Sequence, residues 1–483
     1  MHDDINKKVI YATKWTAFTE IVVKIISPIT NMILARLLTP EIFGIVASIT
    51  LVTSFANIFT DVGFQKYIIQ HEFKNKSDFD LGVSVAFWTN LIISIIIWGI
   101  IIIFNKKIAI FVGCEGYGNV INLTSVILIY TAFSSIQMAV YKKKFRFKKL
   151  AVVRIVCKTM PLIITLPLAI LGYGYWSLII GNLIGELINA VILTIGSEWK
   201  PKFKYSINRL KEMFSFCGWT LCEAVSAWVV ANIGIFLIGR FYNPYYLGLY
   251  KAGMTTVNQI LSIITSTISS VIFTTLSSLQ DNEKEYKYMF LSFQKMVGLF
   301  VLPLGIGILI FRETVTIILL GNQWLEVSLL VGCWGLVSSI NIVFGNMASF
   351  VLLSKGKPHF TFYTNIIQIM LLILVYRFSL GYGFSSLVVL SSLVALQISV
   401  TQVQNAKKFI MLKKWEILDN VMHYLVASII MGVVGSLLKL LGTGLTKNIF
   451  YIIICIFVYF FVLMFYPSER KLMRDLLKKV NIK

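Results

Sequence analysis

The hydrophobic positions of this chain fall into long blocks separated by short polar connections. Each block is roughly 20 residues long, the length that an α-helix needs to cross about 30 Å of hydrocarbon. Backbone polar groups in lipid must be satisfied internally, so we expect helices; the short alternating segments of a membrane barrel do not occur. The pattern predicts an all-α polytopic membrane protein with fourteen spans, at residues 15–35, 42–64, 82–104, 120–140, 151–171, 174–194, 214–239, 246–276, 293–311, 327–353, 361–380, 383–404, 420–441 and 447–466.

The basic residues are distributed unevenly between the two sides of these spans. Of the 44 lysines and arginines, 32 lie at the N-terminus, in connections after even-numbered spans or in the C-terminal tail, against eight after odd-numbered spans. Cytoplasmic connections of membrane proteins carry an excess of Lys and Arg. The distribution therefore predicts an even number of spans and places both termini in the cytoplasm.

Several short patterns occur twice in the same order, as in a duplicated membrane unit. One pattern, Arg-x3-Pro-x3-Gly, and a Trp-Thr pair both recur 204 positions later, as Arg36, Pro40 and Gly44 with Arg240, Pro244 and Gly248, and as Trp15-Thr16 with Trp219-Thr220. The Gly-Tyr-Gly segment at 172–178 recurs at 381–387. The alternative to a duplication is chance similarity between apolar segments. We predict a six-span lobe at 1–200, a second in the same orientation at 201–412, and two extra spans with a basic tail at 413–483.

Composition excludes several classes of soluble protein. Of the 483 residues, 57% are hydrophobic and 14% charged, and the mean hydropathy is +0.80. A net charge of +22 would point to nucleic acid in a soluble protein, but the positive-inside rule accounts for it here, and membrane lipids are the expected partners. The six cysteines and four histidines are scattered, so we expect neither a disulfide framework nor a metal site. No cleavage site follows the first block, which predicts an uncleaved N-terminus.

Beyond the basic residues counted with the connections, some of which lie near a span end, four more lie inside predicted spans, where a central Lys or Arg costs at least about 2.5 kcal/mol. They are Lys24 in the first span, Arg154 and Lys158 one helical turn apart in the fifth, and Lys251 in the eighth. Lys158, Lys24 and Lys251 step from the inner to the outer half of the bilayer. Charge-assisted hydrogen bonds along this path would hold a buried negative charge such as a pyrophosphate. In a simpler role, Arg154 snorkels to the inner face.

Four acidic residues inside the spans leave a second interpretation open. They are Glu20, Asp61, Glu186 and Glu223. Glu20 stands four residues before Lys24, the spacing at which the two charges neutralise each other on a helix. The acids either pair with the bases or bind H+ or Na+ during coupled transport, and the sequence does not choose. We expect no other cofactor.

The repeated prolines and glycines have a mechanical interpretation. Pro40 and Pro244 stand where one span ends and the next begins, a position at which the missing N–H costs little. Gly44 and Gly248, one turn later, permit close helix contact. Pro28, inside the first span, frees a backbone carbonyl and is a candidate hinge.

Signatures of soluble enzymes do not stand out. Asp78 and Asp80 form an Asp-x-Asp pair of the kind that holds a metal in sugar transferases, but their neighbours form an ordinary short loop. No GxxxxGK[ST] pattern occurs, which excludes a nucleotide-driven motor of that class. We predict no catalytic residues. A membrane polysaccharide polymerase is the remaining enzyme alternative, and it would need a large outside loop or a metal site.

The segment 33–44 reads Ile-Leu-Ala-Arg-Leu-Leu-Thr-Pro-Glu-Ile-Phe-Gly, and Asp61-Val62-Gly63-Phe64 and Ile68-Ile69-Gln70 follow it. Together with the loop Phe145-Arg146-Phe147 and the turn at 172–178, these residues resemble Wzx-type polysaccharide flippases. Those proteins belong to the multidrug/oligosaccharidyl-lipid/polysaccharide (MOP) exporter superfamily. The resemblance covers essentially the whole chain and is strongest over the first 180 residues.

This resemblance implies two six-helix lobes, often with two added helices, and a cationic central cavity. It implies a flippase that moves undecaprenyl-pyrophosphate-linked oligosaccharides from the cytoplasmic to the outer leaflet of the bacterial plasma (inner) membrane by alternating access. The product would be surface polysaccharide: lipopolysaccharide O-antigen, capsule or exopolysaccharide. We expect a monomer that works beside other polysaccharide assembly proteins. An ion-coupled, MATE-like exporter of small cations is the alternative, and acids would dominate its cavity.

Overall fold

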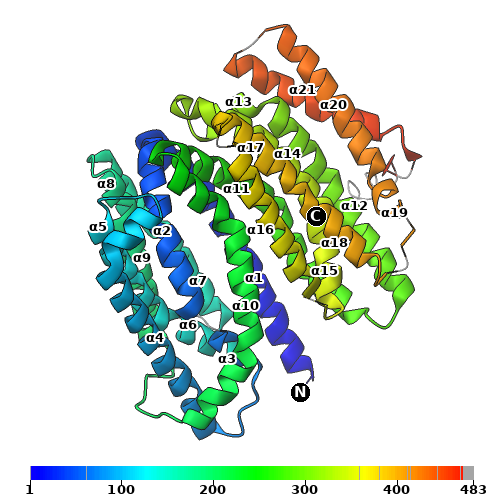
Figure 1. Cartoon of the computed structure of the whole chain (residues 1–483). Helices are drawn as coiled ribbons and strands as arrows, with labels where there is room; N and C mark the ends of the chain where they lie inside the picture. The colour runs from blue at the N-terminus through cyan, green and yellow to red at the C-terminus, as the bar shows by residue number, and fades with distance from the viewer. Residues whose placement is uncertain are drawn as a thin grey trace. The chain divides into compact units, whose positions relative to one another are not determined.

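The chain folds into helices joined by short connections (Figure 1). This computed structural model describes residues 2–60, 63–357, 359–379, 381–410, 412–413, 415–442, 444–467 and 469–470, of which residues 2–14, 17, 215–220, 223, 266–267, 269–270 and 274 are described without their side chains. In that part of the chain every regular element is helical. The prediction of an all-α polytopic membrane protein is confirmed.

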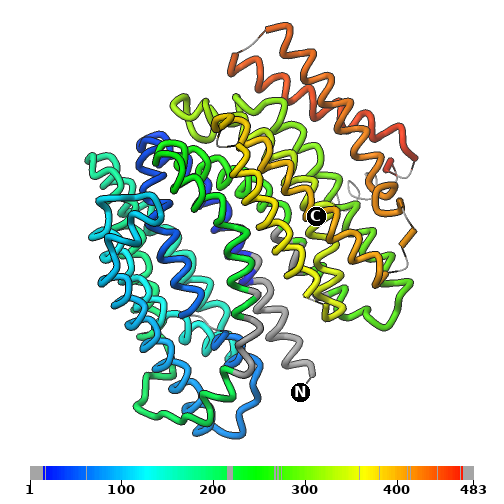
Figure 2. The backbone as a smooth tube through the Cα atoms, viewed as in Figure 1, coloured from blue at the N-terminus to red at the C-terminus, as the bar shows by residue number. Residues whose placement is uncertain are grey.

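The helices form two compact units, Met1–Ala252 and Gly253–Lys483. Figure 2 traces the backbone through both. The first unit contains α1 (His2–Leu37), α2 (Pro40–Thr60), α3 (Phe64–Gln70), α4 (Lys76–Phe111), α5 (Gly118–Ser125), α6 (Ile127–Lys143), α7 (Phe147–Met160), η1 (Pro161–Thr165), α8 (Leu166–Ile170), α9 (Tyr175–Gly196), α10 (Ile207–Phe241) and the start of α11 (Pro244–Ser278). This division does not test the lobe boundaries predicted near residues 200 and 412.

Among its described residues, the second unit contains the rest of α11 and ten further α-helices with two irregular helical turns. Its elements are α12 (Glu283–Ile310), α13 (Arg312–Leu319), η2 (Asn322–Val327), α14 (Ser328–Ile340), η3 (Asn341–Asn346), α15 (Met347–Ser354), α16 (His359–Ser379), α17 (Gly383–Val394), α18 (Leu396–Ala406), α19 (Glu416–Asp419), α20 (Met422–Leu440) and α21 (Leu445–Leu463).

Thirteen helical segments within the described residues are long and apolar enough to cross a membrane. They coincide with thirteen of the fourteen predicted spans. The eighth predicted span, 246–276, is helical as part of α11, but this helix is rich in Ser and Thr and is not one of the thirteen. The total of fourteen spans and the orientation of the termini stay predictions.

Helix boundaries follow from local chemistry. Pro40 and Pro244 are the first residues of α2 and α11, where a proline costs no intrahelical hydrogen bond. Asn75 caps α4 by accepting from the Asp78 N–H at 2.9 Å, which satisfies one of the orphan donors of the first turn. α1 continues through Pro28. Proline has no N–H to donate to the carbonyl four residues earlier, so the freed carbonyl is that of Lys24.

The core of the first unit surrounds α6. Ile136 and Ala139 are fully buried and pack with Phe87 of α4 and Phe64 of α3. Buried hydroxyl groups in these helices donate to carbonyls of their own helix, as Ser84 does to Asp80 O at 2.6 Å. Each of these hydroxyl groups is thus satisfied within its own helix, as a helix in lipid requires.

The helix pair α20–α21 packs against α12 in the second unit through buried tyrosines. The Tyr459 hydroxyl donates to Leu299 O at 2.7 Å, and the Tyr424 hydroxyl donates to Glu469 at 2.6 Å. Away from this seam the pair is apolar and exposed, for example at Leu437 and Phe457. Its outer surface therefore suits lipid.

Candidate functional site

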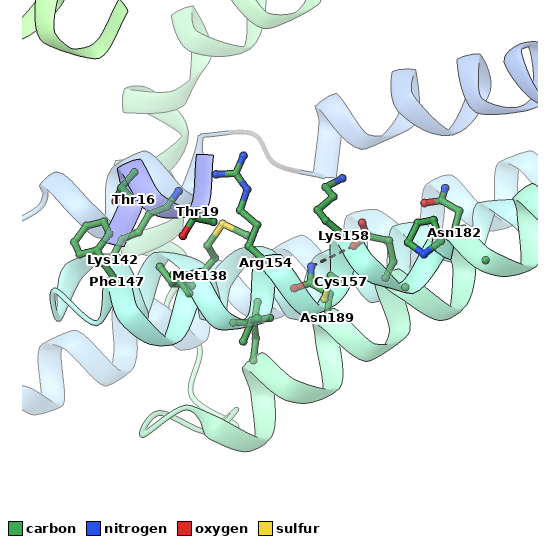
Figure 3. A pocket seen from close by; sticks show the side chains of 18 residues that line it. Thr16, Thr19, Met138, Lys142, Phe147, Arg154, Cys157, Lys158, Asn182 and Asn189 are labelled. Atoms are coloured by element: carbon green, nitrogen blue, oxygen red, sulfur yellow. Dashed lines mark hydrogen bonds between the residues drawn. The ribbon is translucent and has the colours of Figure 1, made fainter. Parts of the chain in front are cut away.

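A cavity of about 440 Å³ lies in the first unit between α7 and α9, with α1, α6 and η1 at its edges. We call it the α7–α9 cavity. Its volume falls within the range of small-ligand pockets. Arg154 and Lys158 line it, one helical turn apart on α7, and their side chains extend in the same direction (Figure 3). Two like charges on one face of a helix favour an anionic ligand.

The Arg154 guanidinium forms an ion pair with the Glu20 carboxylate of α1. The Lys24 ammonium interacts electrostatically with both groups. The structure therefore brings three predicted residues together, and this cluster carries one net positive charge. Arg154 remains 48% exposed and Glu20 31% exposed, so the pair is open to exchange with a competing anion.

Lys158 is exposed in the α7–α9 cavity and forms no ion pair with any acidic side chain that the structure describes. Glu186 of α9 lines the same cavity and accepts a hydrogen bond from the Asn189 amide at 3.2 Å. Figure 3 shows this bond as a dashed line. The cavity thus contains an acid that is hydrogen-bonded within its own helix and a base that has no ion pair among the described side chains.

The remaining predicted charges lie elsewhere or are not described. Lys251, on α11, is half-buried and is not part of the lining of the α7–α9 cavity. Asp61 and the side chain of Glu223 lie outside the described residues.

Two asparagines of the cavity were missed by sequence reasoning. Asn182 and Asn189 lie on α9 with Glu186 between them, at helical spacings of four and three residues. That spacing puts all three polar side chains on one face of an otherwise apolar helix. A search for polar stripes at helical period would have found them, whereas a search for charges alone found Glu186.

Small residues of α9 let it approach the cavity wall. A Cβ placed on Gly181 would lie 1.8 Å from Thr165 Oγ1 of η1. η1 is a single turn of π-helix that begins at Pro161, and such turns are frequent at functional sites. A side chain at Gly181 would therefore displace the wall that borders the cavity.

The turn residues are placed together, away from the α7–α9 cavity. Pro40 and Pro244 begin α2 and α11, and Gly44 and Gly248 lie one turn later where the two backbones touch.

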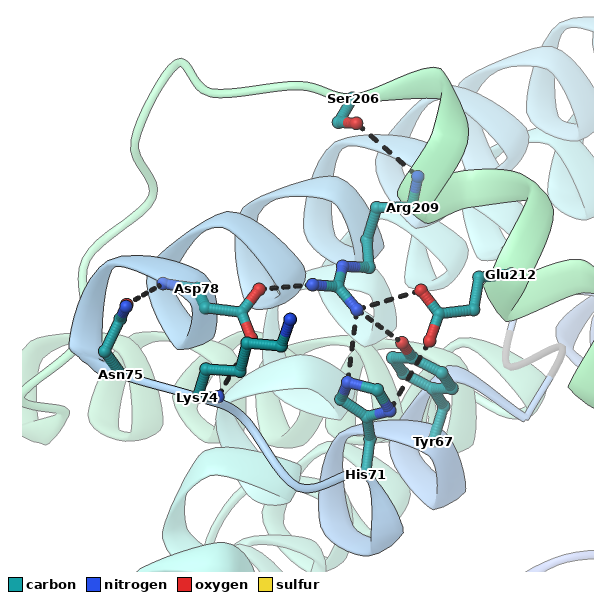
Figure 4. A network of polar contacts seen from close by, with 8 residues as sticks. All are labelled: Tyr67, His71, Lys74, Asn75, Asp78, Ser206, Arg209 and Glu212. Carbon is teal, nitrogen blue, oxygen red and sulfur yellow. Dashed lines mark hydrogen bonds and ion pairs between the residues drawn. The ribbon is translucent and has the colours of Figure 1, made fainter.

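Arg209 near the start of α10 binds several groups from α3 and α4 (Figure 4). Its guanidinium pairs with Asp78, and it donates to His71 Nε2 at 3.1 Å, to the Tyr67 hydroxyl at 3.3 Å and to Glu212 at 2.8 Å. We call this set the Arg209 network. Asp78 is thus an ion-pair partner, and Asp80 of the same Asp-x-Asp pair binds Lys202.

No group of His, Cys, Asp and Glu among the described residues is arranged to hold a metal ion.

The sequence profile of a family described as "Polysaccharide biosynthesis protein" matches residues 33–329. The chain belongs to this family. It is 24% identical to the teichuronic acid biosynthesis protein TuaB of Bacillus subtilis (strain 168), over 74% of this chain and 74% of TuaB. It is 18% identical to the lipopolysaccharide biosynthesis protein WzxC of Escherichia coli (strain K12), over 76% of this chain and 74% of WzxC.

The fold of this polysaccharide biosynthesis protein is similar to that of the lipid II flippase MurJ in an inward closed conformation. The TM-score is 0.78 at 15% identity, over 97% of this chain and 100% of the MurJ chain. The resemblance to Wzx-type proteins of the MOP superfamily is confirmed at the level of family and fold. The chain is a multi-pass membrane protein.

Proposed function

We propose that this protein is a flippase for lipid-linked oligosaccharides. Its substrate would be an undecaprenyl-pyrophosphate-linked repeat unit, moved from the cytoplasmic to the outer leaflet for surface polysaccharide assembly. The observation that carries the proposal is the α7–α9 cavity, in which Arg154 and Lys158 stand side by side and only Arg154 has an acidic partner among the described side chains. Family membership and the MurJ-like fold support it.

Binding of the pyrophosphate follows from the chemistry of these side chains. A guanidinium binds phosphate oxygens through two parallel N–H groups, and an ammonium adds a mobile point charge. When a phosphate enters, it competes with Glu20 for Arg154. Lys158 can bind the phosphate without first leaving an ion pair with a described acidic side chain. Lys24 and Lys251 would contact the pyrophosphate at later stages, and transport would expose the site to each side of the membrane in turn.

The cellular setting completes the proposal. We infer that the protein resides in the bacterial plasma membrane with both termini in the cytoplasm, because the basic connections are concentrated on one side. It would act as a monomer beside other polysaccharide assembly proteins. Glu186, held in the α7–α9 cavity by Asn189, would be the site of H+ or Na+ coupling.

One observation favours a second function, export of small cations, because Glu20 and Glu186 are acids near the same cavity. In that case Glu186 would bind the cation directly, and Arg154 and Lys158 would oppose it. Their charge in the cavity makes the flippase the better proposal.

The test uses a strain that lacks the gene and carries plasmid copies. Arg154→Ala combined with Lys158→Ala should abolish surface polysaccharide and leave lipid-linked repeat units on the inner leaflet. Lys149→Ala is the matched control, since Lys149 is an exposed lysine of the same helix that does not line the cavity. Undiminished polysaccharide with the double variant present in the membrane would reject the proposal. Sensitivity to cationic dyes in the deletion strain would support the exporter instead.

A further inference from the structure

The connection between α9 and α10, residues 197–206, is fixed against the side of α4. The Trp88 indole N–H donates to Lys202 O at 2.8 Å, and Tyr205 shares a hydrogen bond of 3.0 Å with Thr89. The Lys202 ammonium pairs with Asp80 at 2.5 Å. These bonds set the height of the connection along α4.

On this fixed backbone the connection exposes aromatic and apolar side chains. Phe203 is 92% exposed, although one face of its ring stacks on Trp88 with the centroids 4.7 Å apart. Tyr205 and Ile207 are also exposed. Lys204 stands between the two aromatic residues in the sequence; it is exposed and has no ion-pair partner among the described side chains. A cluster of exposed apolar side chains of this kind marks a surface that contacts an apolar phase or a partner.

The apolar phase is identified by the face of α4 that continues from Trp88. Exposed isoleucines follow it at helical spacing, namely Ile92, Ile95, Ile96, Ile100 and Ile103. Lys106 and Lys107 come next. Nineteen residues separate Trp88 from Lys107, which is about 29 Å of helix at about 1.5 Å per residue. This matches the roughly 30 Å of a hydrocarbon core, so Trp88 and Phe203 lie at one edge of it and Lys107 at the other.

We propose that Phe203, Lys204 and Tyr205 form a binding site for the headgroup of an acidic phospholipid. The two rings occupy the boundary between headgroups and acyl chains, where aromatic residues gather. The Lys204 ammonium then reaches the lipid phosphate and its negative charge. The continuity of the site with the isoleucine face favours bilayer lipid over a soluble protein partner.

This lipid would be a resident of the site and not the transported molecule, so the inference goes beyond the proposed function. Only the assignment of this lipid site to the cytoplasmic leaflet depends on the proposed function, because the proposed topology places residues 197–206 on the cytoplasmic side. The site ties the connection between two membrane helices to the bilayer itself. Its occupancy would depend on headgroup charge.

The experiment measures lipids retained by the full-length protein. Purified protein is titrated in detergent with phosphatidylglycerol or phosphatidylcholine, and bound lipids are counted by native mass spectrometry. Lys204→Glu should lower phosphatidylglycerol retention about fivefold or more, without changing phosphatidylcholine retention. Lys284→Glu is the control, because it makes the same charge change at an exposed lysine in the first turn of α12.

A second measurement places the aromatic residues. A spin label attached to Phe203→Cys should be accessible to oxygen and shielded from a water-soluble nickel reagent in nanodiscs. Three results would overturn the proposal: equal phosphatidylglycerol retention in the Lys204 variant and the wild type, an equal loss for both lipids, or a label that is fully accessible from water.

Discussion

Gly44 and Gly248 make reciprocal backbone contacts between α2 and α11. A Cβ placed on Gly44 would lie 1.8 Å from the Pro244 carbonyl oxygen, and one on Gly248 would lie 1.7 Å from the Pro40 carbonyl oxygen. The glycine of each turn contacts the proline of the other turn, and reciprocal contacts of this kind are typical of two segments related by a two-fold axis. The two copies of the repeated sequence meet each other at this point.

Replacing either glycine by alanine should destabilise the protein. The atom that a new Cβ would meet is a backbone oxygen, so relief requires a shift of a whole helix. We expect a loss of about 1–3 kcal/mol for each of Gly44→Ala and Gly248→Ala. The double variant should lose less than the sum, because the first substitution already separates the helices. Thermal unfolding in detergent measures the loss of stability in the two single variants and in the double variant.

Gly99→Ala provides the matched control. Gly99 lies inside α4, and a Cβ there would have no neighbour within 4 Å. Alanine is the better helix former, so this variant should be neutral or slightly more stable. If Gly44→Ala behaved like Gly99→Ala, the close contact between α2 and α11 would be wrong.

The Arg209 network should hold α10 against α3 and α4. Arg209 and Asp78 are only 18% and 15% exposed. Burial alone would lower the pKa of Arg209, but its hydrogen bond to Tyr67 and the charges of Glu212 and Asp78 outweigh burial and raise that pKa. The guanidinium therefore stays charged. Asp78→Arg should cost about 1.5–3 kcal/mol or more, since it removes a charged hydrogen bond and adds a like charge.

Exchanging the two charges distinguishes a specific pair from general disturbance. The double variant Asp78→Arg with Arg209→Asp should recover part of the stability lost in each single variant. A double-mutant cycle on thermal unfolding gives the coupling energy. A coupling energy near zero would mean that Asp78 does not stabilise the protein through its ion pair with Arg209.

Glu416 should make the stability of the second unit depend on pH. Burial raises the pKa of this carboxyl, but hydrogen bonds from Lys287 Nζ at 2.8 Å and from the Lys413 N–H at 2.9 Å, with the charges of both lysines, lower it overall. A carboxyl with a lowered pKa in the folded state stabilises the fold above its unfolded pKa. That contribution is lost as the pH falls through the lowered value.

Unfolding of the wild type and Glu416→Gln should therefore differ at neutral pH and converge in acid. The pair is partly exposed, so the difference should be about 1 kcal/mol or less. Melting temperatures measured between pH 7 and pH 3 test this. A gap that persists at pH 3 would mean that the variant acts through packing and not through charge.

Local sequence patterns predicted the helices well because block length and helical period are properties of neighbouring residues. They also singled out Arg154, Lys158 and Glu186, which are polar groups in apolar blocks. Glu20 shows where such reasoning stops. Its spacing predicted an interaction with Lys24, but its ion-pair partner Arg154 is 134 positions away. The spacing of residues along one helix does not indicate which residues of another helix will pack against them.

The same limit applies to the repeat. The sequence identified Gly44 and Gly248 as equivalent and as suited to close contact, but equivalence alone does not say that the two copies touch each other there. The Arg209 network likewise joins residues from α3, α4 and α10 that no local pattern relates. Both arrangements depend on packing between distant segments.

Glu20→Gln should tighten binding of a pyrophosphate-bearing lipid. The substitution removes the acid that pairs with Arg154 and keeps the side chain's size, so a phosphate no longer competes for the guanidinium. An exposed pair of this kind is worth about 0.2–1 kcal/mol, which predicts an affinity gain of about 1.4- to fivefold. Titration of purified protein with a lipid-linked pyrophosphate measures it, and Glu41→Gln, at an exposed acid in the first turn of α2, is the control. Weaker binding in Glu20→Gln would show that Glu20 orients Arg154 for the substrate and does not compete with it.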